Sequence, residues 1–386
     1  MEQMSTASVG PELLVAIELS KKTWLVACHD PSTGKISRHG VAGGDAAALT
    51  TVLGRLADVV IRRLGSAVSV TCVYEAGYDG FWLQRELGAA DIGCLVMDPA
   101  SLKVDRRARR VKTDRIDAES LLRALLSWRR GDRQACRFVR VPSVAEEDAR
   151  RPHRELDRLR RERVAHVNRI KGLLALHGTR DYQPLRRDRR ERLETLATAN
   201  GQLLPPRLRQ ELGRELDRLE LVLDQIASLS TELQEASADA GAPATAQAIQ
   251  RLEQLTCIGQ ETATVLAREV LCRDFRDRRS LAAFTGLTPS PYSSGKLHHE
   301  QGISKAGNSL VRARLIQLAW RWVRFQTDSQ ISRWFVARTA QAGPRQRRIA
   351  IVAVARKLIV ALWRYSESGL VPEGARLKLA ATPAAS

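Results

Sequence analysis

Two aspartates three residues apart, Asp114 and Asp117, constrain this chain more than any other feature. Apolar residues recur behind them at helical spacing, at Ile116, Leu121, Leu122, Leu125 and Leu126. Positions i and i+3 share one helix face, so both carboxylates should project the same way. The segment before them contains a run of cationic side chains, Arg106, Arg107, Arg109, Arg110 and Lys112. The pair therefore fits either a metal-dependent phosphoryl-transfer site or acids favoured by the helix dipole.

The charge of the chain points to a polyanionic partner. The 386 residues carry a formal net charge of +19, mostly from arginine, which favours bidentate phosphate contacts. No apolar run of about 18 residues and no signal-peptide pattern is present, so we expect a cytoplasmic protein without membrane association. The six cysteines are scattered without a Cys-x-x-Cys pair, which predicts reduced core thiols rather than disulfides or a zinc site.

Two further acids end predicted strands upstream of this helix. An apolar run from Leu13 ends at Glu18, a second strand follows at 23–27, and alternating apolar residues from Val68 end at Glu75. With helices at 45–64 and after Gly77, and a strand at 92–97, this order predicts an α/β domain of the ribonuclease H type at 12–130. In that fold Glu18, Glu75, Asp114 and Asp117 would meet at one edge of the sheet.

The rest of the chain is predicted to be all-α. After a linker at 142–147, residues 143–236 should form a helical connector, with a coiled-coil seam at Leu212, Leu216, Leu219, Leu223, Ile226 and Leu233. The arginines on its other faces are either a solvated surface or a nucleic-acid contact. A second linker is expected at 236–248, and a C-terminal domain at 249–368. The ends, 1–11 and 369–386, should be disordered.

Two segments of the C-terminal part could meet phosphate. Residues 250–272 have the spacing of a helix-hairpin-helix with a single glycine, Gly259, in its turn, although an ordinary helical hairpin fits equally. A loop between two helices carries Gly286, Ser293-Ser294-Gly295-Lys296 and then Lys305-Ala306-Gly307-Asn308. It could hold a phosphate or expose a nucleophilic hydroxyl, but Ser-Ser-Gly is also a common turn. Helices should follow at 310–325 and 349–363, the second packing the C-terminal core.

These motifs occur in a recognisable order. Glu75-Ala76-Gly77, Lys112-Thr113-Asp114-Arg115-Ile116-Asp117-Ala118, the loop from Gly286 to Gly295, the Lys305–Asn308 turn and the helix with Ala353-Val354-Ala355-Arg356-Lys357-Leu358 follow one another. The series resembles the DEDD transposases of bacterial insertion sequences, of the insertion-sequence 110 type, from about Leu13 to Trp363. The resemblance implies a RuvC-like N-terminal domain, a coiled-coil connector and a C-terminal transposase domain with a catalytic serine.

The resemblance also implies a chemistry and partners. Four acids, Glu18, Glu75, Asp114 and Asp117, would hold Mg²⁺, with Mn²⁺ as the alternative ion. Ser294, with Ser293 as the fallback, would attack a DNA phosphate and form a 5′-phosphoserine link. Donor and target DNA, a structured guide RNA encoded by the element and a homo-oligomer, dimer or tetramer, would be the partners in the bacterial cytoplasm. The nucleic-acid contacts would come from Arg106, Arg107, Arg109, Arg110, Lys112, Lys296 and Lys305.

One departure from the family pattern leaves alternatives open. The family usually has Asp where this chain has Glu18, and the added methylene moves the carboxylate although Mg²⁺ requires near-octahedral geometry. The chain could instead be a RuvC-like Mg²⁺-dependent endonuclease that uses water, with Ser294 structural. It could also be a catalytically decayed nucleic-acid-binding protein in which Glu18 marks the loss of metal.

Overall fold

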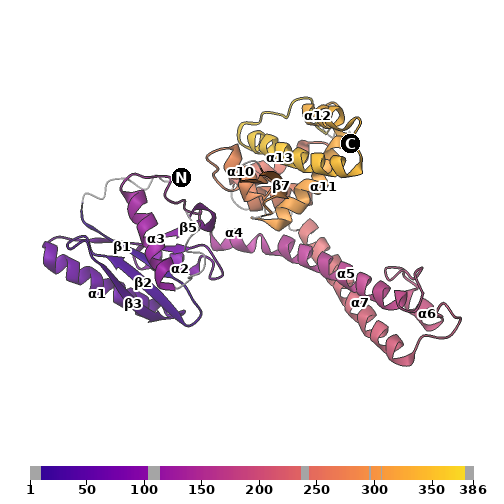
Figure 1. The fold of residues 1–386 in the computed structure, drawn as a ribbon, viewed down its shortest axis with the longest axis horizontal. Coiled ribbons are helices and arrows are strands. Elements are labelled where there is room, and N and C mark those ends of the chain that lie inside the picture. Colours follow the sequence, from indigo (N-terminus) through magenta and orange to yellow (C-terminus); the bar gives the residue numbers. More distant parts are fainter. Residues whose placement is uncertain (1–9, 103–113, 236–242, 295–296, 306, 379–386) are drawn as a thin grey trace, which may run out of the picture. The chain divides into compact units, whose positions relative to one another are not determined.

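The computed structural model describes residues 10–102, 114–235, 243–294, 297–305 and 307–378. The chain divides into two compact units, residues 1–142 and 143–386 (Figure 1). Within the described ranges, no helix is long and apolar enough to span a membrane. All six cysteines lie in these ranges as free thiols, and three of them, Cys28, Cys72 and Cys136, are buried.

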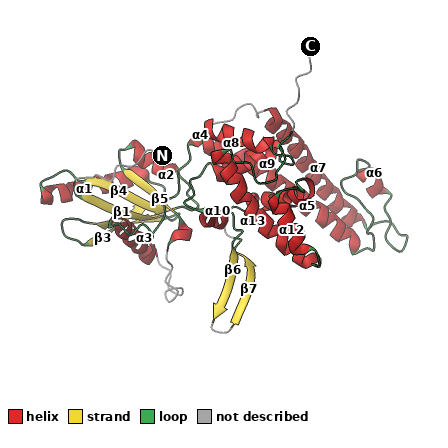
Figure 2. Ribbon diagram, turned by 90° about the horizontal axis from the view of Figure 1, so that it is seen from above, coloured by secondary structure: helices red, strands yellow, loops and turns green. Residues whose placement is uncertain are grey.

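The first unit is built on a five-stranded mixed sheet. Its strands are β1 (Glu12–Glu18), β2 (Thr23–His29), β3 (Ile36–Ala42), β4 (Ser69–Glu75) and β5 (Gly93–Met97). They lie in the order β3-β2-β1-β4-β5 (Figure 2). Strand β1 is antiparallel to β2 and parallel to β4, and β4 is parallel to β5. The edge strand β3 was not predicted, because most of its residues are exposed and its sequence lacks apolar alternation.

Alternate residues of the central strand face opposite helical layers. Leu13, Val15 and Ile17 pack with helices α1 (Ala46–Leu64) and α2 (Trp82–Ala89). Leu14 and Ala16 pack instead with α3 (Asp114–Arg129) on the other face. A short helix η1 (Pro99–Ser101) follows β5. Because successive side chains of a strand point to opposite faces of the sheet, neighbouring residues of β1 pack against different helical layers.

The second unit begins with an antiparallel helical pair. Its helices are α4 (Val144–Asp148), α5 (Arg151–Ala175), α6 (Arg189–Glu194) and α7 (Pro206–Glu235). The predicted apolar seam of α7 is confirmed, since its residues pack against α5 (Figure 1). The expected linker at 142–147 is partly wrong. Ser143 and Glu146 form a capping box that starts α4 within it.

Among the described residues, seven helical segments form the C-terminal core. They are α8 (Pro243–Gln254), α9 (Gln260–Leu266), a π-helical segment η3 (Ala267–Leu271), α10 (Arg278–Phe284), α11 (Ser309–Phe325), α12 (Gln330–Thr339) and α13 (Pro344–Ser368). Helix α13 is longer than the predicted 349–363, and Val354, Leu358 and Leu362 on it are fully buried. Helix α8 starts inside the expected linker at 236–248, and α12 was not predicted. The division of this unit into a connector and a third domain remains a prediction.

The segment 369–378 corrects another expectation, since it packs on this core instead of being disordered. The buried side chain of Gln326 donates to the carbonyl oxygens of Thr256 and Arg376 at 2.9 Å each, and accepts from the Arg376 amide at 2.7 Å. Lys378 Nζ donates to the Ile258 carbonyl at 2.9 Å. Because these contacts are mostly to backbone groups, no apolar pattern in the sequence encodes them.

Candidate active site

Two predicted acids end adjacent parallel strands. Ile17 lies opposite Tyr74 in the pairing of β1 with β4, so Glu18 and Glu75 follow at neighbouring strand ends. Val73 shares the cluster of apolar residues under α3. Because residues two positions apart lie on the same face of a strand, Glu18 and Glu75 both lie on the face that α3 covers. The fold therefore brings the two strand acids to one edge and one face of the sheet.

Helix α3 adds Asp117 to that face. Its neighbour Ala118 is fully buried against the sheet, and the Oδ2 atom of Asp117 is buried with no hydrogen-bond partner among the described residues. A buried carboxylate oxygen without a donor or cation is costly, so it marks a place where a positive group would stabilise the protein. Asp114 is the first residue of α3, one helical turn before Asp117.

The described carboxylates do not form a complete set of metal ligands. Across the described ranges, no three His, Cys, Asp or Glu side chains lie close enough together to hold a metal ion. Oxygen donors alone, as offered here, suit Mg²⁺ or Mn²⁺ rather than zinc. The predicted basic residues next to α3, Arg106, Arg107, Arg109, Arg110 and Lys112, lie outside the described residues.

The predicted serine lies on a β-hairpin rather than in the expected loop between two helices. Strands β6 (Pro289–Ser294) and β7 (Leu297–Ile303) pair in antiparallel fashion, and the hairpin extends away from the helices (Figure 2). Ser294 is the last residue of β6, opposite Leu297, and Ser293 lies opposite His298. The two prolines of β6 are typical of a loop. Proline is nevertheless tolerated in an edge strand, and both strands of this two-stranded sheet are edge strands. Lys296 lies outside the described residues.

The base of the hairpin is fixed by backbone hydrogen bonds. The Ser304 amide donates to the Thr288 carbonyl at 2.9 Å, and the Lys305 amide donates to the Gly286 carbonyl at 3.2 Å. Lys305 is exposed and has a φ of +55°, which is unusual for a residue with a side chain. Its carbonyl accepts from Arg312 Nη1 at 2.9 Å, so the backbone of Lys305 has a structural role.

The predicted glycine–asparagine turn is also structural. Gly307 has a φ of +79°, and a Cβ atom there would lie 2.0 Å from the carbonyl oxygen of Phe284, so only glycine fits. Asn308 caps α11 by accepting from the Val311 amide at 3.2 Å. Its Nδ2 donates to Oε2 of Glu269 at 2.9 Å. The turn therefore connects the hairpin to α10, α11 and η3.

Two glutamates, Glu261 and Glu269, bind arginines of α5 and so connect the coiled coil with the helices of the C-terminal core. Glu269, only 2% exposed, accepts two hydrogen bonds from Arg154 of α5, at 2.6 and 2.9 Å. Glu261 of α9 accepts from Arg160 and Arg314. Burial opposes ionisation of Glu261, but the hydrogen bond from Arg160 and the charge of Arg314 hold the pKa of its carboxyl below its usual value. The hairpin base and the coiled coil are thus joined through charged side chains.

In the segment expected to form a helix-hairpin-helix, the residue with a left-handed backbone conformation is not the glycine of the turn. Cys257 has a φ of +73°, whereas Gly259 is extended and precedes α9 as its N-cap. The glycine is therefore not the left-handed residue of this turn. Contact of the turn with a DNA phosphate remains a prediction.

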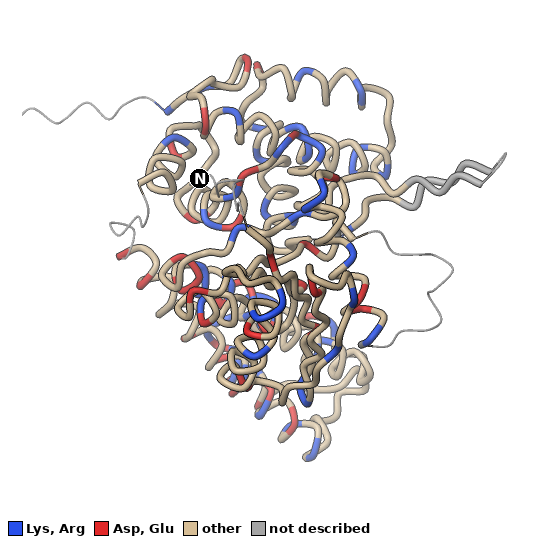
Figure 3. The backbone as a smooth tube through the Cα atoms, turned by 90° about the vertical axis from the view of Figure 1, so that its left-hand side faces the viewer, with Lys and Arg blue, Asp and Glu red and all other residues tan. Residues whose placement is uncertain are grey.

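The arginines of the coiled coil are largely paired with acids. Arg158, Arg161 and Arg169 of α5 each lie within 4 Å of a carboxylate, and Arg190 of α6 pairs with Asp217 of α7. Basic and acidic positions are interspersed along the helices (Figure 3). Of the two interpretations of this surface, the pairing favours a solvated ion-pair network over a nucleic-acid contact.

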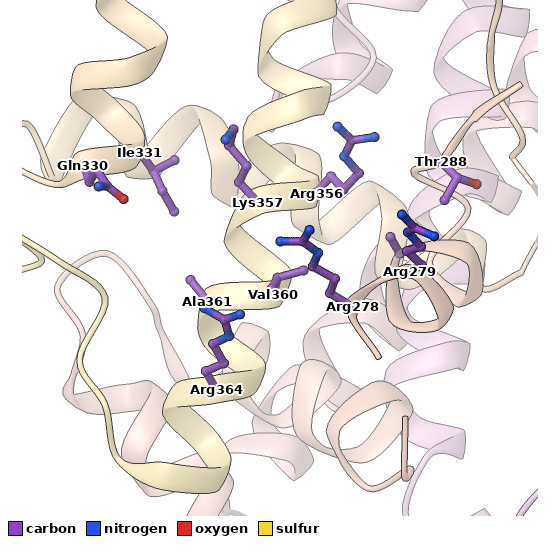
Figure 4. Close-up of a pocket in the computed structure, with 11 residues that line it drawn as sticks. Arg278, Arg279, Thr288, Gln330, Ile331, Arg356, Lys357, Val360, Ala361 and Arg364 are labelled. Atoms are coloured by element: carbon purple, nitrogen blue, oxygen red, sulfur yellow. The ribbon is translucent and has the colours of Figure 1, made fainter. Parts of the chain in front are cut away.

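A basic cavity in the C-terminal core was missed in the sequence. It measures about 480 Å³ and is lined by residues of α10, α12 and α13 and by Thr288 just before β6 (Figure 4). Its cationic lining residues are Arg278, Arg279, Arg356, Lys357 and Arg364. The only sequence signal was the spacing of Arg356, Val360 and Arg364, which places them on one face of a helix.

Comparison with known proteins shows that this chain is similar to transposases of insertion sequences. Residues 249–335 match the family model described as Transposase IS116/IS110/IS902 family. The chain is 46% identical over 374 residues to "Putative transposase y4rJ" of Sinorhizobium fredii, covering 95% of this chain and 94% of that protein. It is 30% identical over 312 residues to "Transposase for insertion sequence element IS1111A" of Coxiella burnetii, covering 80% of this chain and 79% of that protein. The segment matched by the family model includes the hairpin and the turn that fixes it.

Proposed function

The chain belongs to the IS116/IS110/IS902 family of transposases, and from that premise we propose that it cleaves and joins the DNA strands of an insertion sequence with Ser294 as the nucleophile. The observation that carries the proposal is the position of Asp117. Its buried carboxylate oxygen lacks a partner among the described residues, on the sheet face where Glu18 and Glu75 end adjacent strands. Such a face suits a bound cation beside a DNA phosphate.

The proposed fold of the first unit is RuvC-like. The sheet order β3-β2-β1-β4-β5, with three consecutive antiparallel strands followed by two strands parallel to β1, supports it. Glu18, Glu75, Asp114 and Asp117 would hold Mg²⁺, or Mn²⁺ in its place. When bound, the ion offsets phosphate charge and lowers the pKa of an attacking hydroxyl. Ionised carboxylates and DNA phosphates repel each other, so the four acids would disfavour DNA in the absence of a cation.

The proposed reaction joins the serine covalently to DNA. The Ser294 oxygen attacks phosphorus and loses its proton, and the bond from phosphorus to the 3′ oxygen breaks, so a 3′-hydroxyl leaves. The product is a 5′-phosphoserine, which conserves the phosphodiester energy until a 3′-hydroxyl of another strand reverses the step. The hairpin supports this role, because its base is held by two backbone hydrogen bonds while Ser294 lies at its far end.

The proposal includes the partners that the family resemblance implies. Donor and target DNA are the substrates, an element-encoded structured RNA pairs with both, and the protein acts as a homo-oligomer. The net charge of +19 supports binding to polyanions. Because the acids and the serine lie in different compact units, oligomer contacts or docking of the units would assemble the site.

Trapping of the covalent intermediate tests the proposal. Wild-type protein is incubated with Mg²⁺ and DNA labelled on the 5′-phosphate side of the cleaved bond, and then denatured. We expect labelled protein from wild type and from Ser293→Ala, but none from Ser294→Ala. Cleavage by Ser294→Ala without any covalent product in the wild type would instead indicate an endonuclease that uses water. If wild type with Mg²⁺ neither cleaves nor joins DNA, the chain is a decayed transposase.

A further inference from the structure

The basic cavity of the C-terminal core differs from the other charged surfaces of this unit. None of its five cationic side chains forms an ion pair with a carboxylate in the described part of the chain, unlike the arginines of the coiled coil. The nearest acid in sequence, Asp277, caps α10 by accepting from the Arg279 and Ser280 amides. The cavity thus gathers positive charge without a resident counter-charge.

The cavity is built by elements of fixed geometry. Arg356, Lys357 and Arg364 come from α13, whose opposite face is the buried centre of the core. Arg278 points from α10 toward the part of α13 that carries Val360 and Arg364 (Figure 4). Lys357 Nζ lies 4.8 Å from the centre of the Trp334 ring, which orients its stem. An acid-free group of arginines and one lysine, carried by two packed helices, matches the chemistry of phosphate binding.

Thr288 connects the cavity to the hairpin. It lines the cavity and immediately precedes β6, whose last residue is Ser294. Six residues of extended strand span about 20 Å. Phosphates along one strand of duplex DNA follow each other at about 3.4 Å of axial rise, so 20 Å corresponds to about six base-pair steps.

We propose that this cavity binds a backbone phosphate of the DNA duplex on which Ser294 acts, about six base-pair steps along the duplex axis from the phosphate that is attacked. This inference rests on the proposed function, since it takes Ser294 as the attacking residue. The contact positions the DNA along the hairpin and carries no base specificity, because phosphate contacts fix register rather than sequence.

Charge removal tests the binding. The full-length triple variant Arg278→Gln/Lys357→Gln/Arg364→Gln is compared with Arg345→Gln/Arg347→Gln/Arg348→Gln, which removes the same charge from the exposed first turns of α13. The probe is a duplex DNA spanning one end of the insertion sequence. We expect about a tenfold loss of affinity for the cavity variant and a decrease of about 1 in the salt slope, against at most about threefold for the control. Equal losses for the two variants would overturn the proposal.

A second measurement locates the contact. Single neutral methylphosphonates are placed at successive positions of the duplex, and binding is measured with Ser294→Ala as the parent protein so that no joining intervenes. We expect a neutral linkage about six steps from the cleaved bond to weaken binding by the parent, and to have no effect on the parent that also carries the cavity substitutions. If no position shows this dependence on the cavity, the inference is wrong.

Two comparisons separate this inference from others. If the cavity variant loses affinity only for a duplex RNA of the same sequence, the cavity is an RNA site and the DNA proposal is overturned. If the cavity-dependent DNA phosphate is found but wild type forms no covalent product, the cavity inference stands and the Ser294 mechanism fails. Covalent joining without any cavity dependence would support the Ser294 mechanism and overturn the cavity inference.

Discussion

Arg154 of α5 and Glu269 of η3 form a two-pronged ion pair, with Nε and Nη2 at 2.6 and 2.9 Å from the two carboxylate oxygens. Glu269 is buried, and the hydrogen bond that its carboxylate accepts from Arg154 raises the pKa of the Arg154 guanidinium. The same glutamate accepts from Asn308 at the start of α11. One buried carboxylate therefore connects the coiled coil with the helix that follows the hairpin.

We expect Arg154→Ala to lower the free energy of unfolding of the protein by about 2–3 kcal/mol, because it leaves the buried Glu269 carboxylate with Asn308 as its remaining neutral donor. Denaturant unfolding followed by circular dichroism measures this. Arg158→Ala on the same helix is the matched control, since Arg158 pairs only with exposed acids of its own helix. Its cost should be at most about 0.5 kcal/mol. Equal costs at both positions would contradict a structural role for the Arg154–Glu269 pair.

We expect Asp117→Asn to reduce Mg²⁺-dependent DNA joining at least about 100-fold and to abolish stabilisation of the protein by Mg²⁺. Without metal, its melting temperature should be unchanged or higher, since the substitution removes the charge of a carboxylate whose Oδ2 atom is buried without a described partner. Calorimetry with and without Mg²⁺ measures both effects. Glu119→Gln is the control, because Glu119 bonds Arg38 and Arg123 instead. An Asp117→Asn protein that Mg²⁺ still stabilises like wild type would remove Asp117 from the metal site.

The stability of the second unit should decrease in mild acid through His153. Burial and the nearby charge of Arg268 lower the pKa of this histidine to about 4, despite Glu261 and Glu269 close by. The unfolded chain binds the proton near the ordinary histidine pKa of about 6.5. The contribution of His153 to the free energy of unfolding is therefore fully present above that pH and is lost as the pH falls toward 4. The shift corresponds to at most about 3 kcal/mol.

Unfolding free energies measured from pH 8 to pH 4.5 for wild type and His153→Gln test this assignment. We expect the wild type to lose more stability than the variant over this range, each relative to its own value at pH 8. Parallel curves for the two proteins would show that His153 binds its proton equally well in the folded and unfolded states.

Gln326 follows the last residue of α11 as its C-cap. We expect it to contribute more to the free energy of unfolding than the exposed residues of that helix. Gln326→Leu leaves the Thr256 and Arg376 carbonyls and the Arg376 amide without their buried partner. We expect a loss of about 2–4 kcal/mol, together with faster proteolysis of the segment 369–378. Gln317→Leu, at an exposed position of α11, should change stability by less than about 0.5 kcal/mol. A protein that tolerates Leu at 326 as well as at 317 would contradict this role.

The periodic elements were predictable because burial imposes a regular spacing on apolar residues. The apolar runs that end at Glu18 and Glu75 predicted β1 and β4, and the heptad spacing from Leu212 predicted α7. The edge strand β3 and helix α12 were missed because at least half of the residues of each are exposed, which leaves few positions for an apolar pattern. The hairpin at 289–303 was missed because its prolines resemble those of a loop.

The sequence by itself determined which acids end strands, where the helix with Asp114 and Asp117 begins and which family the chain resembles, because these features depend on local periodicity and on the order of motifs. Only the tertiary structure showed that Glu18 and Glu75 share the face under α3, and that Asp117 has a buried oxygen without a described partner. It also showed that Arg278 and Arg364 line the same cavity. These relationships join residues far apart in the chain, and packing brings them together only when the whole core forms.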